Sequence, residues 1–241
     1  MQKEIAIIKS DAEGLRKTII DVAEEIACTI TVDGESMCLH CSPGYLPELA
    51  VGFLAGQGAI KSRRDIAKLE SDENSVNILL KDGREGQDAC AVGIIGQSPF
   101  TLEPHEVQVK LAAFHLSTES IKAAMEEFIG LSATYKKTRG VHSIAVGHGE
   151  RRLFWVEDVA RFNAYNKAMG YCILQDLDMQ DKCILLSGRV SAEMVKQAHH
   201  AGIKLLIAKA SPLSQAVDWA RLLNIGLIGL VQGGNCNIYH L

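Results

Sequence analysis

The stretch that decides the fold reads KCILLSGRVSAEMVKQAHHAGIKLLIAKASPLSQAVDWARLLNIGLIGLVQ, residues 182–232. It holds three short apolar runs, which predict buried strands, separated by two segments with helical periodicity. The predicted strands are Cys183–Ser187, Lys204–Ala208 and Leu227–Val231, and the predicted helices are Ser191–Ala201 and Pro212–Leu223. Strands that alternate with helices favour a mostly parallel sheet with flanking helices, in which ligands bind beyond the carboxyl ends of the strands.

Another amphipathic helix is expected to begin in the segment EDVARFNAYNK, residues 157–167, with Asp158 as its N-cap. Its apolar stripe, spaced for a core-facing side, consists of Phe162, Tyr165, Met169 and Cys172. The polar side chains near its start are Asp158, Arg161, Asn163 and Lys167. Backbone N–H groups at a helix N-terminus attract anions, so this set suits a phosphate-bearing ligand. For this segment taken alone, a capped surface helix is the simpler explanation of the same residues.

The chain is expected to divide into a β-rich N-terminal α+β domain, residues 1–115, and a C-terminal domain, residues 116–241. The N-terminal elements are predicted to be a hairpin with strands 26–32 and 35–41 around Asp33-Gly34, a helix from Ser42-Pro43 to about Gly58, a strand at 75–80, a mobile glycine-containing loop at 83–98 and a strand at 106–114. The C-terminal domain is predicted to begin with a helix at 117–135 and two paired strands at 141–146 and 153–156.

The composition bounds the class of protein. The 241 residues carry a net charge of −4 and a pI of about 6.1, which argues against a protein that binds nucleic acid through phosphate contacts. No run approaches the roughly 18 apolar residues of a membrane span, and the first ten residues lack a signal-peptide core. Seven scattered cysteines, an odd number, do not form a disulfide framework, so we expect a cytoplasmic protein in a reducing compartment.

Several short motifs follow the predicted strands, where ligands bind in such sheets. Ser187-Gly188-Arg189 offers a close backbone approach and a planar guanidinium for a phosphate or a purine edge, although an ordinary strand–turn–helix junction explains it too. Ser211 and Pro212 are expected to cap and start the next helix. Gln232-Gly233-Gly234-Asn235-Cys236-Asn237 permits a backbone nest for an anion and also a tight hairpin turn into a final strand, and the two interpretations are compatible. His142, at a strand start, is a candidate ligand contact or proton shuttle.

Cys90 is the cysteine best placed to carry sulfur, because a persulfide carrier needs a thiol that can reach out from an accessible loop. An unreactive loop thiol is the simpler alternative. We expect Cys28, Cys172 and Cys183 to be small core residues. Cys38-Leu39-His40-Cys41 has no second pair of ligands, and His148-Gly149-Glu150 is not followed by the cysteine pair of a zinc deaminase, so no metal site is predicted.

Taken together in order, these segments resemble one family. The matching residues are Asp33-Gly34-Glu35, Ser42-Pro43-Gly44, Glu48-Leu49-Ala50-Val51-Gly52-Phe53-Leu54, Gly140-Val141-His142, Glu157-Asp158-Val159, Arg161, Asn163-Ala164, Lys167, Ser187-Gly188-Arg189, Glu193-Met194-Val195, Pro212, Gly233-Gly234, Asn237 and Tyr239. The chain resembles the formate dehydrogenase accessory sulfurtransferase family, FdhD/NarQ, over nearly its whole length.

The resemblance implies a cytidine-deaminase-like C-terminal domain without the deaminase zinc site, and a homodimer. It implies that sulfur passes from a cysteine desulfurase through a persulfide on Cys90 to the molybdenum cofactor, in its bis(molybdopterin guanine dinucleotide) form, for formate dehydrogenase. GDP would mimic part of that cofactor. The residues expected to bind this cofactor are Leu230, Val231, Gln232, Gly233, Gly234, Asn235, Ser187, Gly188, Arg189, Asp158, Arg161, Asn163, Lys167 and His142.

The chain departs from the family pattern at positions that matter for this activity. The family's relay loop usually carries two cysteines spaced C-x-x-C, and here Gly93 stands where the second would be. Family members generally have Phe and Arg where this chain has Leu230 and Gln232, and a typical Gly and His are replaced by Ala160 and Phe162. These departures keep open a second function, a guanine-nucleotide or cofactor-binding chaperone that has lost the sulfur relay.

Overall fold

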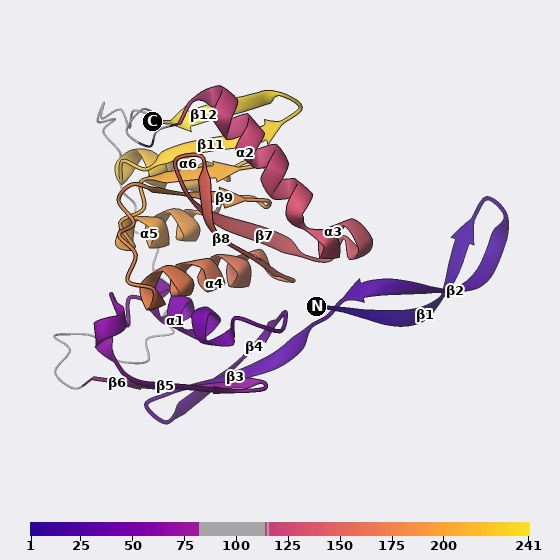
Figure 1. Cartoon of the computed structure of the whole chain (residues 1–241), viewed down its shortest axis with the longest axis horizontal. Helices are drawn as coiled ribbons and strands as arrows, with labels where there is room; N and C mark the ends of the chain where they lie inside the picture. Colours follow the sequence, from indigo (N-terminus) through magenta and orange to yellow (C-terminus); the bar gives the residue numbers. More distant parts are fainter. Residues whose placement is uncertain (82–113, 115) are drawn as a thin grey trace.

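The fold is known from a computed structural model that describes residues 1–81, 114 and 116–241. Within these residues the strands form three sheets, of two, six and four strands. Figure 1 shows helices α1 (Leu46–Gly56) and α4 (Arg161–Leu174) as a layer between the six-stranded and the four-stranded sheets. The predicted mixture of helices and sheets is confirmed. The predicted strand at 106–114 and loop at 83–98, with Cys90, lie outside the described residues apart from Phe114.

The large sheet has the order β12-β11-β10-β9-β7-β8. Its strands are β7 (His142–His148), β8 (Arg151–Asp158), β9 (Lys182–Leu186), β10 (Leu205–Ala208), β11 (Gly226–Gln232) and β12 (Asn235–His240). The three strands predicted from the alternating region are confirmed, and β9, β10 and β11 are parallel. The prediction of a mostly parallel sheet is wrong for their neighbours, because β7 pairs antiparallel with β9 and β8, and β12 pairs antiparallel with β11.

Both faces of the large sheet are buried, and alternate residues of its strands serve opposite cores. Along β9, Ile184 and Leu186 join one core with α4, α5 (Ala192–His200) and α6 (Ser214–Leu222). Cys183 and Leu185 join the other core, which is covered by α2 (Thr118–Leu131). A strand buried on both sides needs apolar residues throughout, which is why the sequence of this region is so uniformly apolar.

The four-stranded sheet has the order β4-β3-β6-β5. Its strands are β3 (Ile26–Val32), β4 (Glu35–Cys41), β5 (Ile66–Asp72) and β6 (Ser75–Leu80). The predicted hairpin is confirmed, since Asp33 and Gly34 link β3 to β4 with φ values of 49° and 91°. Such left-handed pairs match the twist of the flanking strands. A short 3₁₀ helix, η1 (Arg63–Asp65), precedes β5.

Two predicted helix boundaries are wrong. Helix α1 begins at Leu46, with Tyr45 as its N-cap residue, and not at Ser42-Pro43. The helix predicted over 117–135 ends at Leu131, because Ser132 leaves the helical conformation and caps a separate helix, α3 (Ala133–Thr138). The side chain of Ser132 accepts a hydrogen bond from the backbone N–H of Tyr135 and so starts the second helix on a new axis.

Helices α1 and α4 approach each other at two glycines, Gly52 and Gly170. A Cβ added at Gly52 would lie 1.8 Å from the carbonyl oxygen of Asn166, and one added at Gly170 would lie 1.8 Å from that of Glu48. No side chain fits there, so the backbones themselves are in contact. This contact holds α1, which packs on the four-stranded sheet, against α4, which packs on the large sheet.

The first strands, β1 (Gln2–Asp11) and β2 (Gly14–Ala23), form an antiparallel two-stranded arm that the sequence analysis did not predict. The arm projects from the body beside α3, as Figure 1 shows. Among the described residues no helix is long and apolar enough to cross a membrane.

Candidate anion-binding site

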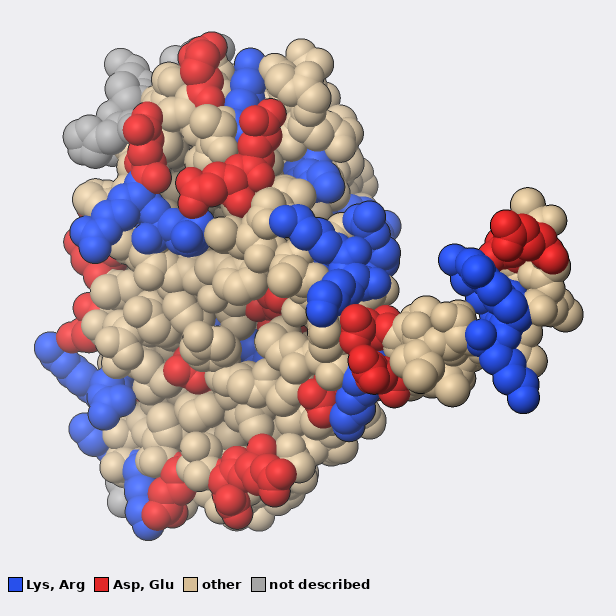
Figure 2. Space-filling model, turned by 45° about the vertical axis from the view of Figure 1, so that its right-hand side comes forward, with Lys and Arg blue, Asp and Glu red and all other residues tan. Residues whose placement is uncertain are grey.

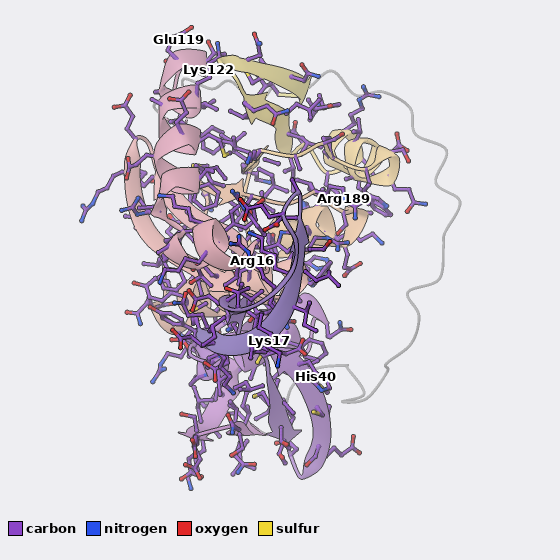
Figure 3. The ribbon with its side chains drawn as sticks, turned by 90° about the vertical axis from the view of Figure 1, so that its right-hand side faces the viewer. Arg16, Lys17, His40, Glu119, Lys122 and Arg189 are labelled. Carbon is purple, nitrogen blue, oxygen red and sulfur yellow. The ribbon has the colours of Figure 1, made fainter. Side chains whose placement is uncertain are left out.

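The turns after β9, β10 and β11 lie together at one edge of the large sheet, as predicted for parallel neighbours. The N–H of Lys209 donates to the carbonyl of Leu186 at 2.8 Å, and that of Leu213 donates to Val190 at 2.9 Å. The N–H of Leu230 donates to Ala210 at 3.2 Å. These backbone bonds fix the three turns against one another, and Figure 3, which looks onto this edge, labels Arg189 in the first of them.

His142, Gly188 and Arg161 meet at this edge where β7 and β9 lie side by side. A Cβ added at Gly188 would lie 3.1 Å from Nδ1 of His142 and 3.6 Å from Cβ of Arg161. The hydroxyl of Ser187 accepts a hydrogen bond of 2.8 Å from the N–H of Ser143, which fixes the turn to β7. The sequence analysis placed all of these residues except Ser143 in the candidate site, and the structure brings them together.

Two guanidinium groups give this point its electrostatic character. Nε of Arg161 is buried and has no hydrogen-bond partner among the described residues, and no ion pair is formed there by Arg161 or Arg189. Burial lowers the pKa of His142, and the positive charges of Arg161 and Arg189 lower it further. A histidine whose protonation is disfavoured by burial and by two nearby arginines, beside an unpartnered donor of the described residues, is an environment that attracts an anion.

The three other polar residues of the α4 segment are bound within the chain. The ammonium of Lys167 lies 2.7 Å from Oδ2 of Asp158, and both side chains are fully buried. Lys167 also donates to the carbonyl of Ser42 at 2.7 Å, and the amide of Asn163 donates to the carbonyl of His40 at 2.8 Å. These contacts tie α4 to the end of β4 and to the segment between β4 and α1. Of this set, Arg161 has a buried donor that no described residue pairs with.

The prediction that Asp158 caps α4 is wrong. Asp158 is the last residue of β8, and the N-cap is Ala160, which has no side-chain acceptor. The carboxylate instead accepts hydrogen bonds from the N–H of Ser42 at 3.0 Å and of Ala160 at 3.0 Å. It therefore organises the turn before the helix, and with it the approach of Arg161, from a buried position.

The segment from Leu230 to Asn235 closes the same edge of the sheet. Gln232 pairs with Asn235 across Gly233 and Gly234, whose φ values are 57° and 75°, so the predicted hairpin turn is confirmed. Leu230 has a φ of 53°, a conformation that costs a non-glycine residue about 1–2 kcal/mol. Strained residues of this kind concentrate at functional sites.

The turn after β10 differs from its prediction. Helix α6 begins at Ser214 with Leu213 as its N-cap, so Ser211 and Pro212 do not start it. The hydroxyl of Ser211 donates to the carbonyl of Pro212 at 3.0 Å. Gly229 faces this turn so closely that an added Cβ would lie 2.7 Å from Cδ of Pro212. Pro212 therefore packs this turn against the bent end of β11.

The described cysteines are poor nucleophiles where they are buried. Cys28, Cys172 and Cys183 are core residues, as predicted. Burial raises the pKa of Cys41, Cys172 and Cys183 to about 12, which keeps these thiols protonated. Cys38 is exposed while Cys41 is buried, so this pair does not point to one side of β4. Within the described ranges no three His, Cys, Asp or Glu side chains gather as metal ligands would.

The sequence analysis missed a buried carboxylate next to this edge. Glu157 is 5% exposed, and its carboxylate accepts hydrogen bonds from the hydroxyls of Ser132 and Ser143. Glu157 thereby links the start of α3 to Ser143 of β7, the residue that follows His142. No local pattern marks it, because its two partners lie 25 and 14 residues away in the chain.

The fold defines an α/β protein with a candidate anion-binding site at the carboxyl edge of a mixed sheet. A model of the FdhD/NarQ family matches residues 23–241, so the chain belongs to that family. Proteins named "Sulfur carrier protein FdhD" are similar to it. The one from Bacillus subtilis (strain 168) is 30% identical over 228 residues, covering 89% of this chain and 86% of the relative. The one from Geobacillus kaustophilus (strain HTA426) is 30% identical over 230 residues, covering 91% and 88%.

A solved structure has the same fold. The crystal structure of a protein from Desulfotalea psychrophila, described as a formate dehydrogenase accessory protein, aligns with a TM-score of 0.80. The alignment covers 100% of this chain and 97% of that one at 19% sequence identity. At this identity the likeness establishes the shared architecture.

Proposed function

We propose that this protein is a sulfur carrier for the maturation of a formate dehydrogenase. Membership of the FdhD/NarQ family and the names of the relatives support this role. The structural observation that carries it is the unpartnered Nε of Arg161 beside Gly188 and His142, where the phosphates of a nucleotide-bearing client would find their counter-charge.

The sulfur is proposed to travel on Cys90 as a persulfide. The Cys90 thiolate attacks the terminal sulfur of a cysteine desulfurase persulfide, the new S–S bond forms as the old one breaks, and the desulfurase cysteine leaves as a thiolate. The protein then acts as a sulfurtransferase with a covalent intermediate. Among the described cysteines, burial disfavours the thiolates of Cys28 and Cys41, so neither competes for this role.

The cargo is proposed to be the molybdenum cofactor in its bis(molybdopterin guanine dinucleotide) form. Its phosphates would be held by Arg161 and Arg189, with Gly188 permitting close backbone approach, and the segment 230–235 would complete the site. GDP is the matching probe. We further propose a cytidine-deaminase-like C-terminal domain, which the antiparallel β7–β8 pair beside three parallel strands supports, and a cytoplasmic homodimer.

Release of the sulfur as sulfide requires two electrons. In a C-x-x-C relay loop, a second cysteine would attack the first, release sulfide and form a disulfide. This chain has Gly93 at the second position. A thiol from outside the loop, small or on a partner, would have to attack Cys90 and form a mixed disulfide instead.

The test of the sulfur relay is a mass measurement on the full-length protein. Incubation with a cysteine desulfurase and cysteine should add one sulfur atom to the peptide that contains Cys90, and dithiothreitol should remove it. Cys38→Ala, which alters an exposed thiol elsewhere, should gain the same mass. No added sulfur on Cys90 would exclude the relay.

The second candidate is a cofactor-binding chaperone without sulfur chemistry. Gly93 and Gln232, where the family has Cys and Arg, favour it. It predicts that Cys90→Ala keeps both GDP binding and formate dehydrogenase maturation in a strain that lacks its own accessory protein. The relay predicts that GDP binding survives and maturation is lost. The two functions therefore give opposite results for maturation.

A further inference from the structure

A cavity lies in the body of the protein between helices α1, α4 and α5, which Figure 1 shows stacked one above another. The cavity belongs to the body and not to the arm, which Figure 2 shows standing clear of it. Its volume is about 300 Å³, at the lower end of the range of roughly 300–1,000 Å³ that small-molecule sites occupy. Its apolar lining includes Ile60, Met169, Cys172, Ile173, Leu177 and Met179. The cavity therefore has the size and the walls of a site for a small organic molecule.

Three helices end at this cavity. Gly56 is the last residue of α1 and His200 is the last residue of α5, and both line the cavity. Ile173, one residue before the end of α4, lines it as well. The C-terminus of an α-helix carries a partial negative charge, because its last carbonyl groups have no partner within the helix. Helices α1 and α4 have no basic residue in the last turn to offset this charge. The three helix ends together therefore favour a positively charged group.

Gln197 adds a polar group whose hydrogen-bonding capacity is not used. Its side chain lines the cavity and is only 5% exposed. Its Oε1 is buried and has no hydrogen-bond partner among the described residues. The amide lies against the backbone of Gly56, where an added Cβ would lie 2.2 Å from Nε2. A half-turn of the amide exchanges its donor and its acceptor, so Gln197 can offer a carbonyl oxygen to a ligand.

The other polar residues of the lining do not oppose a cation. Lys61, Asp176 and His200 line the cavity but are exposed, so water and salt screen their charges. The buried wall therefore decides which charge is preferred. Cys172 does not make the cavity a site of covalent capture, because burial raises the pKa of its thiol to about 12.

We propose that this cavity binds a small organic cation with an apolar body, an alkyl or aryl amine. The apolar body packs on Met169 and Met179, and the ammonium group donates to the amide carbonyl of Gln197 beside the three helix ends. A hydrogen bond from a charged donor to an otherwise unsatisfied buried acceptor is the strongest single contact that this lining offers.

The cavity is distinct from the candidate anion-binding site. Arg161 is the first residue of α4, and the cavity lies at the other end of this 14-residue helix, about 20 Å away at 1.5 Å per residue. The two ends of one helix dipole thus favour ligands of opposite charge. The proposal does not depend on the sulfur relay.

The test of charge preference uses the full-length protein and three probes with the same apolar body. Phenylbutylamine is a cation at neutral pH, phenylbutanol is uncharged and phenylbutanoate is an anion. Calorimetry should show that the amine binds about tenfold more tightly than the alcohol, and that the carboxylate binds most weakly. The proposal is overturned if the amine does not bind, or if the alcohol or the carboxylate binds as tightly as the amine.

Methionine methyl groups report where the amine binds. In protein with carbon-13-labelled methionine methyl groups, the NMR signals of Met169 and Met179 should shift as phenylbutylamine is added. Met37 and Met125 belong to other cores, and their signals should stay in place. Shifts of all four signals, or no shift of Met169 and Met179, would contradict this location.

Filling the cavity should abolish the site. Ala201 lines the cavity, so Ala201→Leu should weaken the binding of phenylbutylamine by about tenfold or more. Ala192→Leu, at the first residue of the same helix and outside the lining, is the matched control and should bind as the wild type does. Equal affinities in the two variants would place the amine elsewhere.

Replacing the amide tests the role of Gln197. Gln197→Met keeps the length of the side chain but removes the acceptor, and it should weaken the binding of phenylbutylamine by about tenfold. Gln175→Met, at an exposed residue just beyond α4, should leave the affinity unchanged. Circular dichroism shows whether each variant is folded, and the probe series on the wild type does not depend on either. Unchanged affinity in folded Gln197→Met would overturn the proposed contact.

Discussion

Lys167 and Asp158 form an ion pair from which water is excluded, with 2.7 Å between Nζ and Oδ2 and no exposed surface on either side chain. Each also binds Ser42, through the carbonyl and the N–H of that residue. The pair thus joins the end of β8, helix α4 and the segment that leads into α1. This ion pair connects the four-stranded sheet to the edge of the large sheet where the candidate site lies.

Removing one partner of this pair should be strongly destabilising. Lys167→Met leaves the Asp158 carboxylate buried without a counter-charge, and we expect a loss of about 3–5 kcal/mol in the free energy of unfolding. Urea denaturation measures it. Arg152→Met breaks the exposed pair with Glu127 and should cost less than about 1 kcal/mol. Equal losses in the two variants would show that the buried pair has no special role.

The glycines between α1 and α4 should tolerate no side chain. Alanine normally stabilises a helix relative to glycine, but at Gly52 or Gly170 its Cβ would collide with a backbone carbonyl. We expect Gly52→Ala to lower the free energy of unfolding by at least about 2 kcal/mol. Gly130→Ala in α2 meets no atom within 4 Å and should raise stability by about 0.5–1 kcal/mol. A stable Gly52→Ala variant would contradict the close contact.

Local signals were sufficient where the decisive contacts are local. The apolar runs of β9, β10 and β11 and the Asp33-Gly34 turn could be recognised because burial on two faces and a left-handed turn each leave a mark on adjacent residues. The place of β7, antiparallel between β8 and β9, left no such mark. It depends on how the β7–β8 hairpin packs onto the finished sheet.

Residues with distant partners were misread for the same reason. Ser42 looks like a helix cap, yet its hydroxyl accepts a hydrogen bond from the N–H of Val159, 117 residues away. Asp158 also looks like a cap but belongs to the same long-range cluster. Gly188 was placed correctly because the carboxyl ends of neighbouring parallel strands meet, and that rule requires only the strand assignment. His142 begins β7 and reaches the same edge because β7 runs antiparallel to β9, so the family resemblance, and not this rule, grouped it with Gly188.

His142 should make GDP binding depend on pH. Its pKa lies below the ordinary value of 6.5, first through burial and then through Arg161 and Arg189. A bound phosphate favours the charged imidazolium, so affinity for GDP should rise as the pH falls from about 7.5 to 5.5. His142→Gln, measured with the same ligand by calorimetry, should lose this part of the rise. An identical pH profile in the two proteins would remove His142 from the site.

When no ligand is bound, His142 should lower the free energy of unfolding of the protein at acidic pH. Because its pKa is lowered in the folded state, the unfolded chain takes up the proton first, and the free energy of unfolding falls as the pH drops through 6.5. His199 and His240 act in the same direction, so the comparison must be between proteins. Urea denaturation at pH 7.5 and 5.5 should show a smaller loss for His142→Gln than for the wild type.

The two arginines at the edge should carry the affinity for a phosphate-bearing ligand. Arg161→Gln and Arg189→Gln should each weaken GDP binding by about 1.5–3 kcal/mol, the range for hydrogen bonds to charged groups. Arg63→Gln, in the distant 3₁₀ helix η1, is the matched loss of charge and should bind GDP as the wild type does. Unchanged affinity in both edge variants would place the ligand elsewhere.

Restoring the arginine that the family has in place of Gln232 should strengthen binding at the same edge. Gln232 is exposed at the end of β11, so a longer side chain can be accommodated without repacking, and Arg can donate to a phosphate or a guanine edge. We expect Gln232→Arg to tighten GDP binding by roughly tenfold, about 1.4 kcal/mol, at unchanged stability.

Gln232→Lys is the control for charge without the planar fork, and it should give a smaller gain. Calorimetry at two salt concentrations separates the two contributions, because a general gain in charge weakens with salt more than a specific contact does. If neither variant binds more tightly, the segment 230–235 does not contact the nucleotide.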